Sequence, residues 1–120
     1  MRSSASAMNL CSELVSVLYE DRSRKTRQAT ANLEEISKTS AVLCLEERVQ
    51  RATAISFRCR HHDLYGIVES CVAHPQLGFF VTVTLDKSSQ WSEKWFTPEH
   101  LLSLWKSAEQ EADTVRGDAA

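Results

Sequence analysis

The sequence predicts an all-β protein: a small six-stranded antiparallel barrel followed by a C-terminal α-helix. Over most of the chain, apolar and polar residues alternate with a period of two, as they do in half-buried strands. Short turn-forming sequences separate these segments, as in small barrels and sandwiches. The period changes only near the end of the chain. A length of 120 residues indicates a single domain.

Six segments carry the strand pattern. In "TAISFRCRH", residues Ile55, Phe57 and Cys59 share one side, and "FFVTVTLD" alternates in the same way. The segment "TRQATANL" alternates weakly and is predicted to be an exposed edge strand. Gly66 interrupts the fifth segment, where a glycine often marks a bulge or a close approach of two backbones. The predicted strands are residues 12–21, 26–33, 41–46, 53–61, 64–74 and 79–86.

The end of the chain predicts a helix. Thr97 is a good N-cap and Pro98 suits the first turn. An apolar stripe follows, which the barrel mouth could bury; it consists of Leu101, Leu102, Leu104 and Trp105. Before the helix, Trp91, Trp95 and Phe96 are expected to dock on the barrel, although tryptophan is also enriched at interfaces. We therefore expect a flexible leader over 1–11, the barrel and helix over 12–111, and a flexible tail over 112–120.

Composition and charge exclude several classes of protein. Fourteen basic and sixteen acidic residues give a net charge of -2, whereas nucleic-acid and anionic-membrane surfaces need a large basic field. No window approaches the ~18 apolar residues of a membrane span, and no apolar signal segment follows the N-terminus. We expect a cytoplasmic protein whose four cysteines are reduced and behave as small hydrophobic residues.

Residues 59–74 bring cysteines and histidines together in the sequence, but without the paired knuckles of structural zinc. We expect Cys59 and Cys71 to pack in the core, and His61, His62 and His74 to be exposed at turns. No metal and no cofactor are predicted. The chain also lacks a nucleophile elbow, a phosphate loop and an H-E-x-x-H motif, so we do not expect an enzyme.

The hydroxyl-rich stretch "EISKTS", residues 35–40, is either a loop that holds a ligand or a turn that needs small polar residues. The hairpin around it, the mid-strand glycine, the "LGFFVTVTL" strand and the terminal helix together resemble a PilZ domain over roughly residues 12–105. In that family a [D/N]-x-S-x-x-G loop and an R-x-x-x-R pair before the first strand clamp cyclic di-GMP. Guanidinium groups suit this task because they stack on guanine and bind phosphate or guanine acceptors.

This chain departs from the family motif at most positions. Ser37 matches the serine, but Glu35 stands where the family has Asp or Asn. Ser40 replaces the glycine, which matters if that position needs a positive φ. Upstream of the first predicted strand the only arginine is Arg2, and the residue four positions later is Ser6. The R-x-x-x-R pair is therefore missing.

Three hypotheses about function remain. The first is a non-catalytic PilZ-like bacterial signalling or protein-interaction domain, which contacts a protein partner and does not bind cyclic di-GMP in the family's usual way. The second is a cyclic di-GMP receptor with a non-standard arginine set from the first hairpin and second strand. The third is an unrelated small β-barrel. The ligand-binding residues in the second hypothesis are Arg22, Arg24, Arg27, Glu35 and Ser37.

Overall fold

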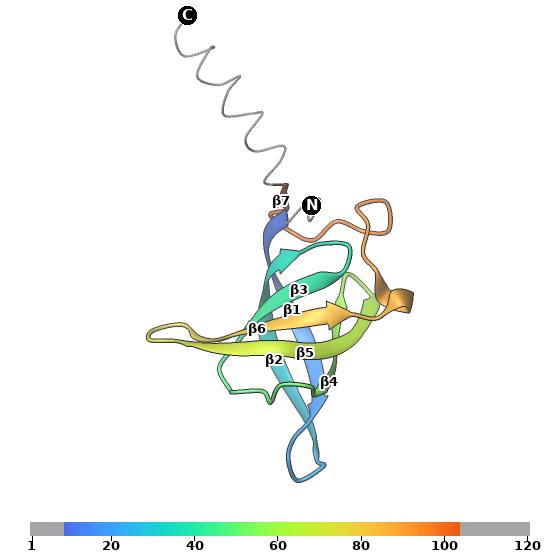
Figure 1. The fold of residues 1–120 in the computed structure, drawn as a ribbon. Helices are drawn as coiled ribbons and strands as arrows, with labels where there is room; N and C mark the ends of the chain where they lie inside the picture. Colours follow the sequence, from blue (N-terminus) through green and yellow to red (C-terminus); the bar gives the residue numbers. More distant parts are fainter. Residues whose placement is uncertain (1–8, 104–120) are drawn as a thin grey trace, which may run out of the picture.

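The computed structural model describes residues 9–103 and shows a closed six-stranded antiparallel barrel (Figure 1). The strand order is β2-β3-β6-β5-β4-β1, and β1 also pairs with β2, which closes the barrel. The all-β barrel prediction is thus confirmed. The strands are β1 (Asn9–Glu20), β2 (Thr26–Ile36), β3 (Ser40–Leu45), β4 (Ala54–Cys59), β5 (His62–His74) and β6 (Gly78–Leu85).

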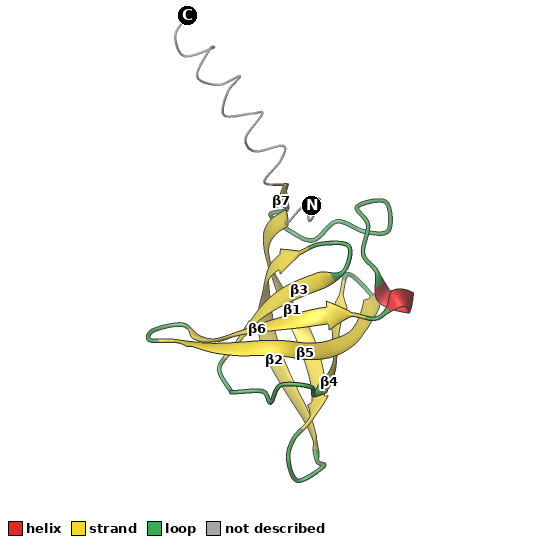
Figure 2. Cartoon of the chain, viewed as in Figure 1, coloured by secondary structure: helices red, strands yellow, loops and turns green. Residues whose placement is uncertain are grey.

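Two short elements follow the barrel strands. A 3₁₀-helix, η1 (Lys87–Ser89), comes directly after β6, and a two-residue strand, β7 (Leu102–Ser103), pairs with the start of β1. The connector between them, residues 90–101, runs as loop and turn past one end of the barrel (Figure 2). That end also carries the β2–β3 loop, because the Trp91 N–H of the connector donates to the Lys38 carbonyl of that loop.

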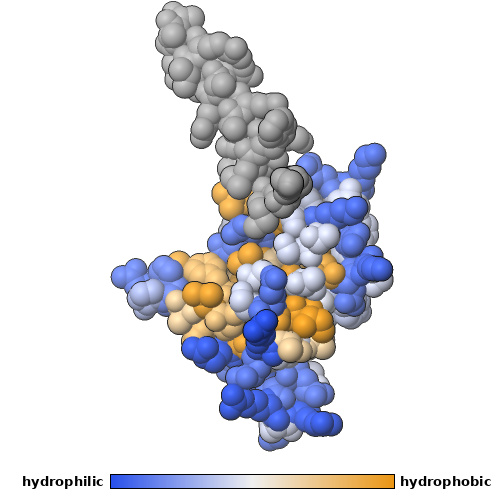
Figure 3. Space-filling model, in the orientation of Figure 1, coloured by the Kyte–Doolittle hydropathy of each residue, from blue (hydrophilic) through white to orange (hydrophobic). Residues whose placement is uncertain are grey.

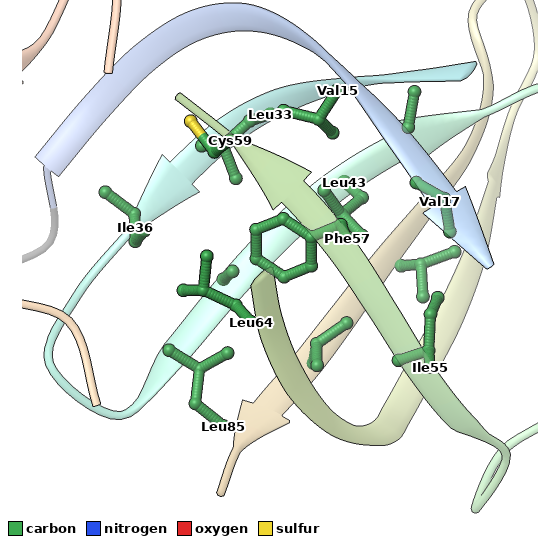
Figure 4. Packing of buried hydrophobic residues seen from close by; sticks show 14 of the residues in the cluster. Val15, Val17, Leu33, Ile36, Leu43, Ile55, Phe57, Cys59, Leu64 and Leu85 are labelled. Carbon is green, nitrogen blue, oxygen red and sulfur yellow. The ribbon is translucent and has the colours of Figure 1, made fainter. Parts of the chain in front are cut away.

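The core consists of the inward faces that the alternation predicted. Val15, Val17 and Tyr19 of β1 are buried, as are Ile55, Phe57 and Cys59 of β4. Figure 4 shows side chains from different strands meeting in one cluster around the Phe57 ring. On β6 the prediction holds for three of four positions, namely Val81, Val83 and Leu85, whereas Phe79 is half-buried.

The barrel begins earlier than the sequence indicated. β1 starts at Asn9, so residues 9–11, which were assigned to the leader, belong to the first strand. Cys11 lies in the core, and the Asn9 side-chain amide donates to the backbone oxygen of Ile36 at 3.1 Å. The sequence alone does not predict these contacts, because they depend on the pairing of the end of β2 with the start of β1.

The prediction that residues 26–33 form an edge strand is wrong. β2 pairs with β1 on one side and with β3 on the other. Its alternation is weak because inward positions carry Ala29 and Ala31, which are small and only mildly apolar. Closure of the barrel, which the sequence pattern does not report, gives β2 its second partner.

A helix does not begin at Thr97. Glu99 and His100 form a turn, and Leu102–Ser103 extends as β7. The backbone here bonds to β1 instead of to itself: the Glu99 N–H donates to the Glu13 carboxylate at 2.6 Å, and the Ser12 N–H donates to the Glu99 carbonyl at 3.1 Å. The remainder of the predicted helix, including Leu104 and Trp105, lies outside the described residues.

Candidate functional site

The β2–β3 loop turns its serine hydroxyl onto its own backbone. Ser37 is only 5% exposed. Its Oγ accepts a hydrogen bond from the Ser40 N–H at 3.1 Å and lies 2.9 Å from the Ser40 hydroxyl. The Ser37 N–H in turn donates to the Ser40 carbonyl at 2.8 Å. The hydroxyl is therefore used to close a turn, which is a common role of serine at such positions.

The last residue of β6 and the connector hold this loop in place. The Leu85 N–H donates to the Thr39 carbonyl at 2.9 Å, and the Trp91 N–H donates to the Lys38 carbonyl at 3.0 Å. The Trp91 ring is buried, and its Nε1–H donates to the Phe96 carbonyl at 3.0 Å. β6 thus occupies the Thr39 carbonyl and the connector occupies the Lys38 carbonyl. Trp91 and Phe96 are buried in the core cluster, which confirms that they dock on the barrel, whereas Trp95 remains 38% exposed.

The positions of Ser40 and Glu35 show what the departures from the motif mean. Ser40 begins β3 opposite Thr84 and does not belong to the described non-glycine residues with positive φ. A glycine is therefore not needed there. Glu35 is half-buried beside a β-bulge, where it pairs with Leu10 and with Val42.

The arginines of the predicted site lie at the opposite end of the barrel. Arg22 and Arg24 are in the β1–β2 turn, and Arg27 is near the start of β2 (Figure 1). Ten residue steps of extended chain separate Arg27 from Ser37, which corresponds to ~33 Å. The structure therefore brings Glu35 and Ser37 near one end and the three arginines to the other, and the five residues do not form one site.

A hollow of about 580 Å³ opens beside the arginines, between the β1–β2 turn and the β3–β4 loop. Arg27 is held there by Glu47 at 2.7 Å and by Asp21 at 3.9 Å. In the described part of the chain, neither Arg22 nor Arg48 has a carboxylate within 4.0 Å. The Arg48 guanidinium lies over the Phe79 ring, 5.1 Å from its centroid. The lining is Tyr19, Glu20, Asp21, Arg22, Ser23, Arg27, Glu47, Arg48, Gln50 and Thr53.

Two ionisable groups of this hollow are tied to each other. The Tyr19 hydroxyl donates to the Glu47 carboxylate at 3.1 Å, and burial together with that carboxylate raises the pKa of Tyr19. Sequence reasoning missed Glu47, Arg48, Gln50 and Thr53 because residues 46–53 carry no motif. Only the folded chain brings this loop beside the hairpin.

The buried thiols are poor nucleophiles. Burial, and after it the charge of Glu13, raises the pKa of both Cys11 and Cys59 to about 12, so both are protonated at neutral pH. Glu13 behaves in the opposite way: burial alone would raise its pKa, but hydrogen bonds from the Glu99 N–H, Arg60 and Cys59 lower it. This carboxylate therefore remains charged and joins β1, the β4–β5 turn and the connector.

The cysteine and histidine cluster separates in space. Cys59 is buried as predicted, whereas Cys71 is half-buried against the core. His61 and His74 are exposed, but His62 is half-buried and stacks on Phe96 with ring centroids 4.8 Å apart. Within residues 9–103, no three His, Cys, Asp or Glu side chains form a group that could hold a metal ion.

Comparison of the chain with protein-family models, with curated proteins and with solved structures found no match. The resemblance to PilZ domains therefore stays an expectation from the sequence alone. Among the described residues, no helix has the length and apolar character needed to cross a membrane.

Replacing Ser37 by alanine is expected to lower the free energy of unfolding by about 1 kcal/mol, because the Ser40 N–H loses its side-chain acceptor. Urea denaturation followed by circular dichroism measures the change. Thr39→Ala is the matched control, since Thr39 is exposed and contributes its backbone carbonyl rather than its hydroxyl. Equal stability of the Ser37→Ala variant and the wild type would show that the turn does not depend on this hydroxyl.

Proposed function

We propose that this chain is a non-catalytic PilZ-like interaction domain of a bacterial signalling pathway, which acts through protein contacts and does not bind cyclic di-GMP through the β2–β3 loop. One observation carries this proposal: the serine hydroxyl that matches the family motif is already bonded within the chain, and so are two carbonyls of the loop. The Ser37 hydroxyl closes its own turn, and the Lys38 and Thr39 carbonyls accept from Trp91 and Leu85.

The placement of positive charge supports the same proposal. A loop that clamps a bis-phosphate needs guanidinium groups close by. Here Arg22, Arg24 and Arg27 lie at the far end of β2, ~33 Å of extended strand away from Ser37.

The hollow beside the β1–β2 turn favours a second candidate function. Its volume of about 580 Å³ lies within the ~300–1,000 Å³ of small-molecule sites. Arg22 has no ion pair there and could bind a phosphate group. Arg48 would first have to leave the Phe79 ring. In this case the chain is a receptor for cyclic di-GMP or a related nucleotide at the opposite end of the barrel from the β2–β3 loop.

Isothermal titration of the purified protein with cyclic di-GMP, at low and at physiological salt, tests both candidates. The expected result is no heat and no thermal shift at a large excess of nucleotide. Micromolar binding that Ser37→Ala weakens and Arg22→Ala leaves unchanged would overturn the proposal. Binding with the reverse dependence would establish the second candidate. Circular dichroism of each variant ensures that a folded protein is titrated.

A further inference from the structure

The outer surface of the barrel carries apolar side chains where a solvent-facing strand normally carries polar ones. Leu14 on β1 is 72% exposed, Val72 on β5 is 60% exposed, and Leu77 in the β5–β6 turn is 58% exposed. Apolar side chains also gather over β5 and β6 in Figure 3, whereas the β1–β2 turn below them is hydrophilic. Exposed apolar side chains that gather on one face often mark an interaction site.

Two of these leucines flank a hollow of about 550 Å³ over the outside of β2, which we call the β2 groove. Strand register explains its position: Leu14 lies opposite Asn32, and Asn32 lies opposite Cys44. The Cys44 thiol is 3.3 Å from the Leu77 carbonyl, so the β5–β6 turn forms the far wall. The lining is Leu14, Gln28, Ala29, Thr30, Ala31, Asn32, Cys44, Leu45, Glu46, Glu47 and Leu77.

The charge of the β2 groove has one sign. Glu46 and Glu47 line it, and no lysine or arginine does so. Glu34 adds a third carboxylate beside it: this side chain accepts from Asn32 Nδ2 at 2.6 Å, and after burial its charge raises the pKa of Cys44. Arg27 compensates Glu47, but Glu34 and Glu46 have no cation within 4.0 Å in the described part of the chain.

We propose that the β2 groove docks a segment of a partner protein that presents a bulky apolar side chain flanked by lysine or arginine. The apolar anchor would sit between Leu14 and Leu77, and the flanking cations would face Glu34 and Glu46. This inference rests on the proposed interaction function and specifies the partner for it. A second copy of this chain fits less well, because two facing grooves would bring carboxylates of like charge together.

A pair of synthetic peptides provides the probe. The first is a fluorescein-labelled 14-residue peptide with one central leucine flanked by lysines, and the second has glutamates in place of the lysines. Fluorescence anisotropy with the full chain is expected to detect the lysine peptide, with affinity that falls as salt rises. The proposal is overturned if the lysine peptide does not bind at concentrations up to about 1 mM. A dissociation constant of that size corresponds to a binding free energy of only ~4 kcal/mol. Equal binding of both peptides also overturns the proposal.

Three variants test whether the lysine peptide binds in the β2 groove. Leu14→Ser is expected to weaken binding of the lysine peptide at least about tenfold, because apolar burial is lost. Glu46→Lys is expected to weaken binding several-fold, which is about the contribution of one surface charge pair. Leu18→Ser is the matched control, because Leu18 is also exposed on β1 but does not line the groove. An equal effect of the two leucine variants overturns the proposal.

Amide chemical shifts separate the failure of this inference from failure of the proposed function. On adding the lysine peptide, shift changes are expected at Thr30, Asn32, Cys44 and Leu77. Changes confined to the β1–β2 turn, or to the separate hollow that Leu18 and Tyr65 line, overturn the groove as the site, yet leave a protein-interaction function intact. A shift of the free chain to dimers in sedimentation velocity, lost in Leu14→Ser, would assign the groove to a second copy and also overturn the proposal. Failure of the proposed function itself is read from the cyclic di-GMP titration, which does not involve the groove.

Discussion

Replacing Trp91 by alanine is expected to lower the free energy of unfolding by about 3–5 kcal/mol. The indole is 4% exposed, and its Nε1–H donates to the Phe96 carbonyl at 3.0 Å. Truncation leaves a cavity under the connector and an unpaired carbonyl in a buried place. It also loosens the backbone bond from the Trp91 N–H to the Lys38 carbonyl, which holds the β2–β3 loop.

Trp95→Ala is the matched control for this prediction. Trp95 is 38% exposed and lies at the edge of the same aromatic cluster, with its ring 5.1 Å from the Phe96 ring and 4.9 Å from the His62 ring. We expect its loss to cost about 1 kcal/mol, the size of an aromatic pair. Urea denaturation of both variants gives the comparison. A Trp91→Ala variant as stable as the wild type would show that this tryptophan is not a core anchor.

Hydrogen exchange adds a local measurement. The Leu85 and Trp91 amides donate to the loop carbonyls, so they are expected to exchange faster in Trp91→Ala relative to amides in the centre of β1, such as that of Val17. If all amides change equally, the connector and barrel unfold only as one unit. In that case the connector has no separate control over the loop.

The inward faces of the strands could be predicted because burial repeats with the same period as the pleat. Val17, Phe57 and Val83 are each less than 2% exposed, and each sits where a period of two places it. In β2 the apolar–polar alternation is weak, because the small residues Ala29 and Ala31 occupy inward positions. Whether a strand has one neighbour or two depends on barrel closure, which no local pattern records.

The candidate site was harder to predict because it depends on which ends of the strands meet. Arg27 and Ser37 are close in sequence, but an extended strand separates them by ~33 Å. The hollow, in contrast, joins Tyr19 to Glu47 and Gln50 from a loop without any motif. In an antiparallel barrel, sequence separation is therefore a poor guide to distance. Residues at the two ends of one strand are near in sequence but far apart in space, whereas turns bring residues that are distant in sequence to the same end of the barrel.

The apolar outer surface is partly visible in the sequence pattern of β1. Leu14 and Leu18 alternate with Ser16 on the face of β1 that is opposite to Val15 and Val17. A strand with leucines on its outward face as well as valines on its inward face is apolar on both sides. The sequence shows this excess, but only the register of β1 with β2 and β3 shows that Leu14 borders a groove.

Replacing Gly66 by alanine is expected to destabilise the barrel by at least about 3 kcal/mol, beyond the usual cost of one added methyl group. A Cβ at this position would overlap the Thr84 carbonyl oxygen and would lie 2.7 Å from Cγ1 of Val83. Gly66 pairs with Ile55 on one side and with Leu85 on the other. The close approach that the mid-strand glycine predicted is therefore confirmed, although the bulge of β5 lies further along, between Val68 and Ser70.

Most of this cost is expected to come from the backbone of β6 and not from a side chain. The variant Gly66→Ala/Val83→Ala removes the methyl contact but leaves the Thr84 carbonyl in place, so we expect it to remain at least about 2 kcal/mol less stable than Val83→Ala alone. Ser70→Ala, half-buried on the same strand, is expected to change stability by less than about 0.5 kcal/mol. Urea denaturation of the wild type, Gly66→Ala, Val83→Ala and the double variant completes the cycle, and Ser70→Ala is measured beside them as the control. If Val83→Ala fully suppresses the cost of Gly66→Ala, side-chain crowding explains the glycine, and the two strands need not lie so close at this point.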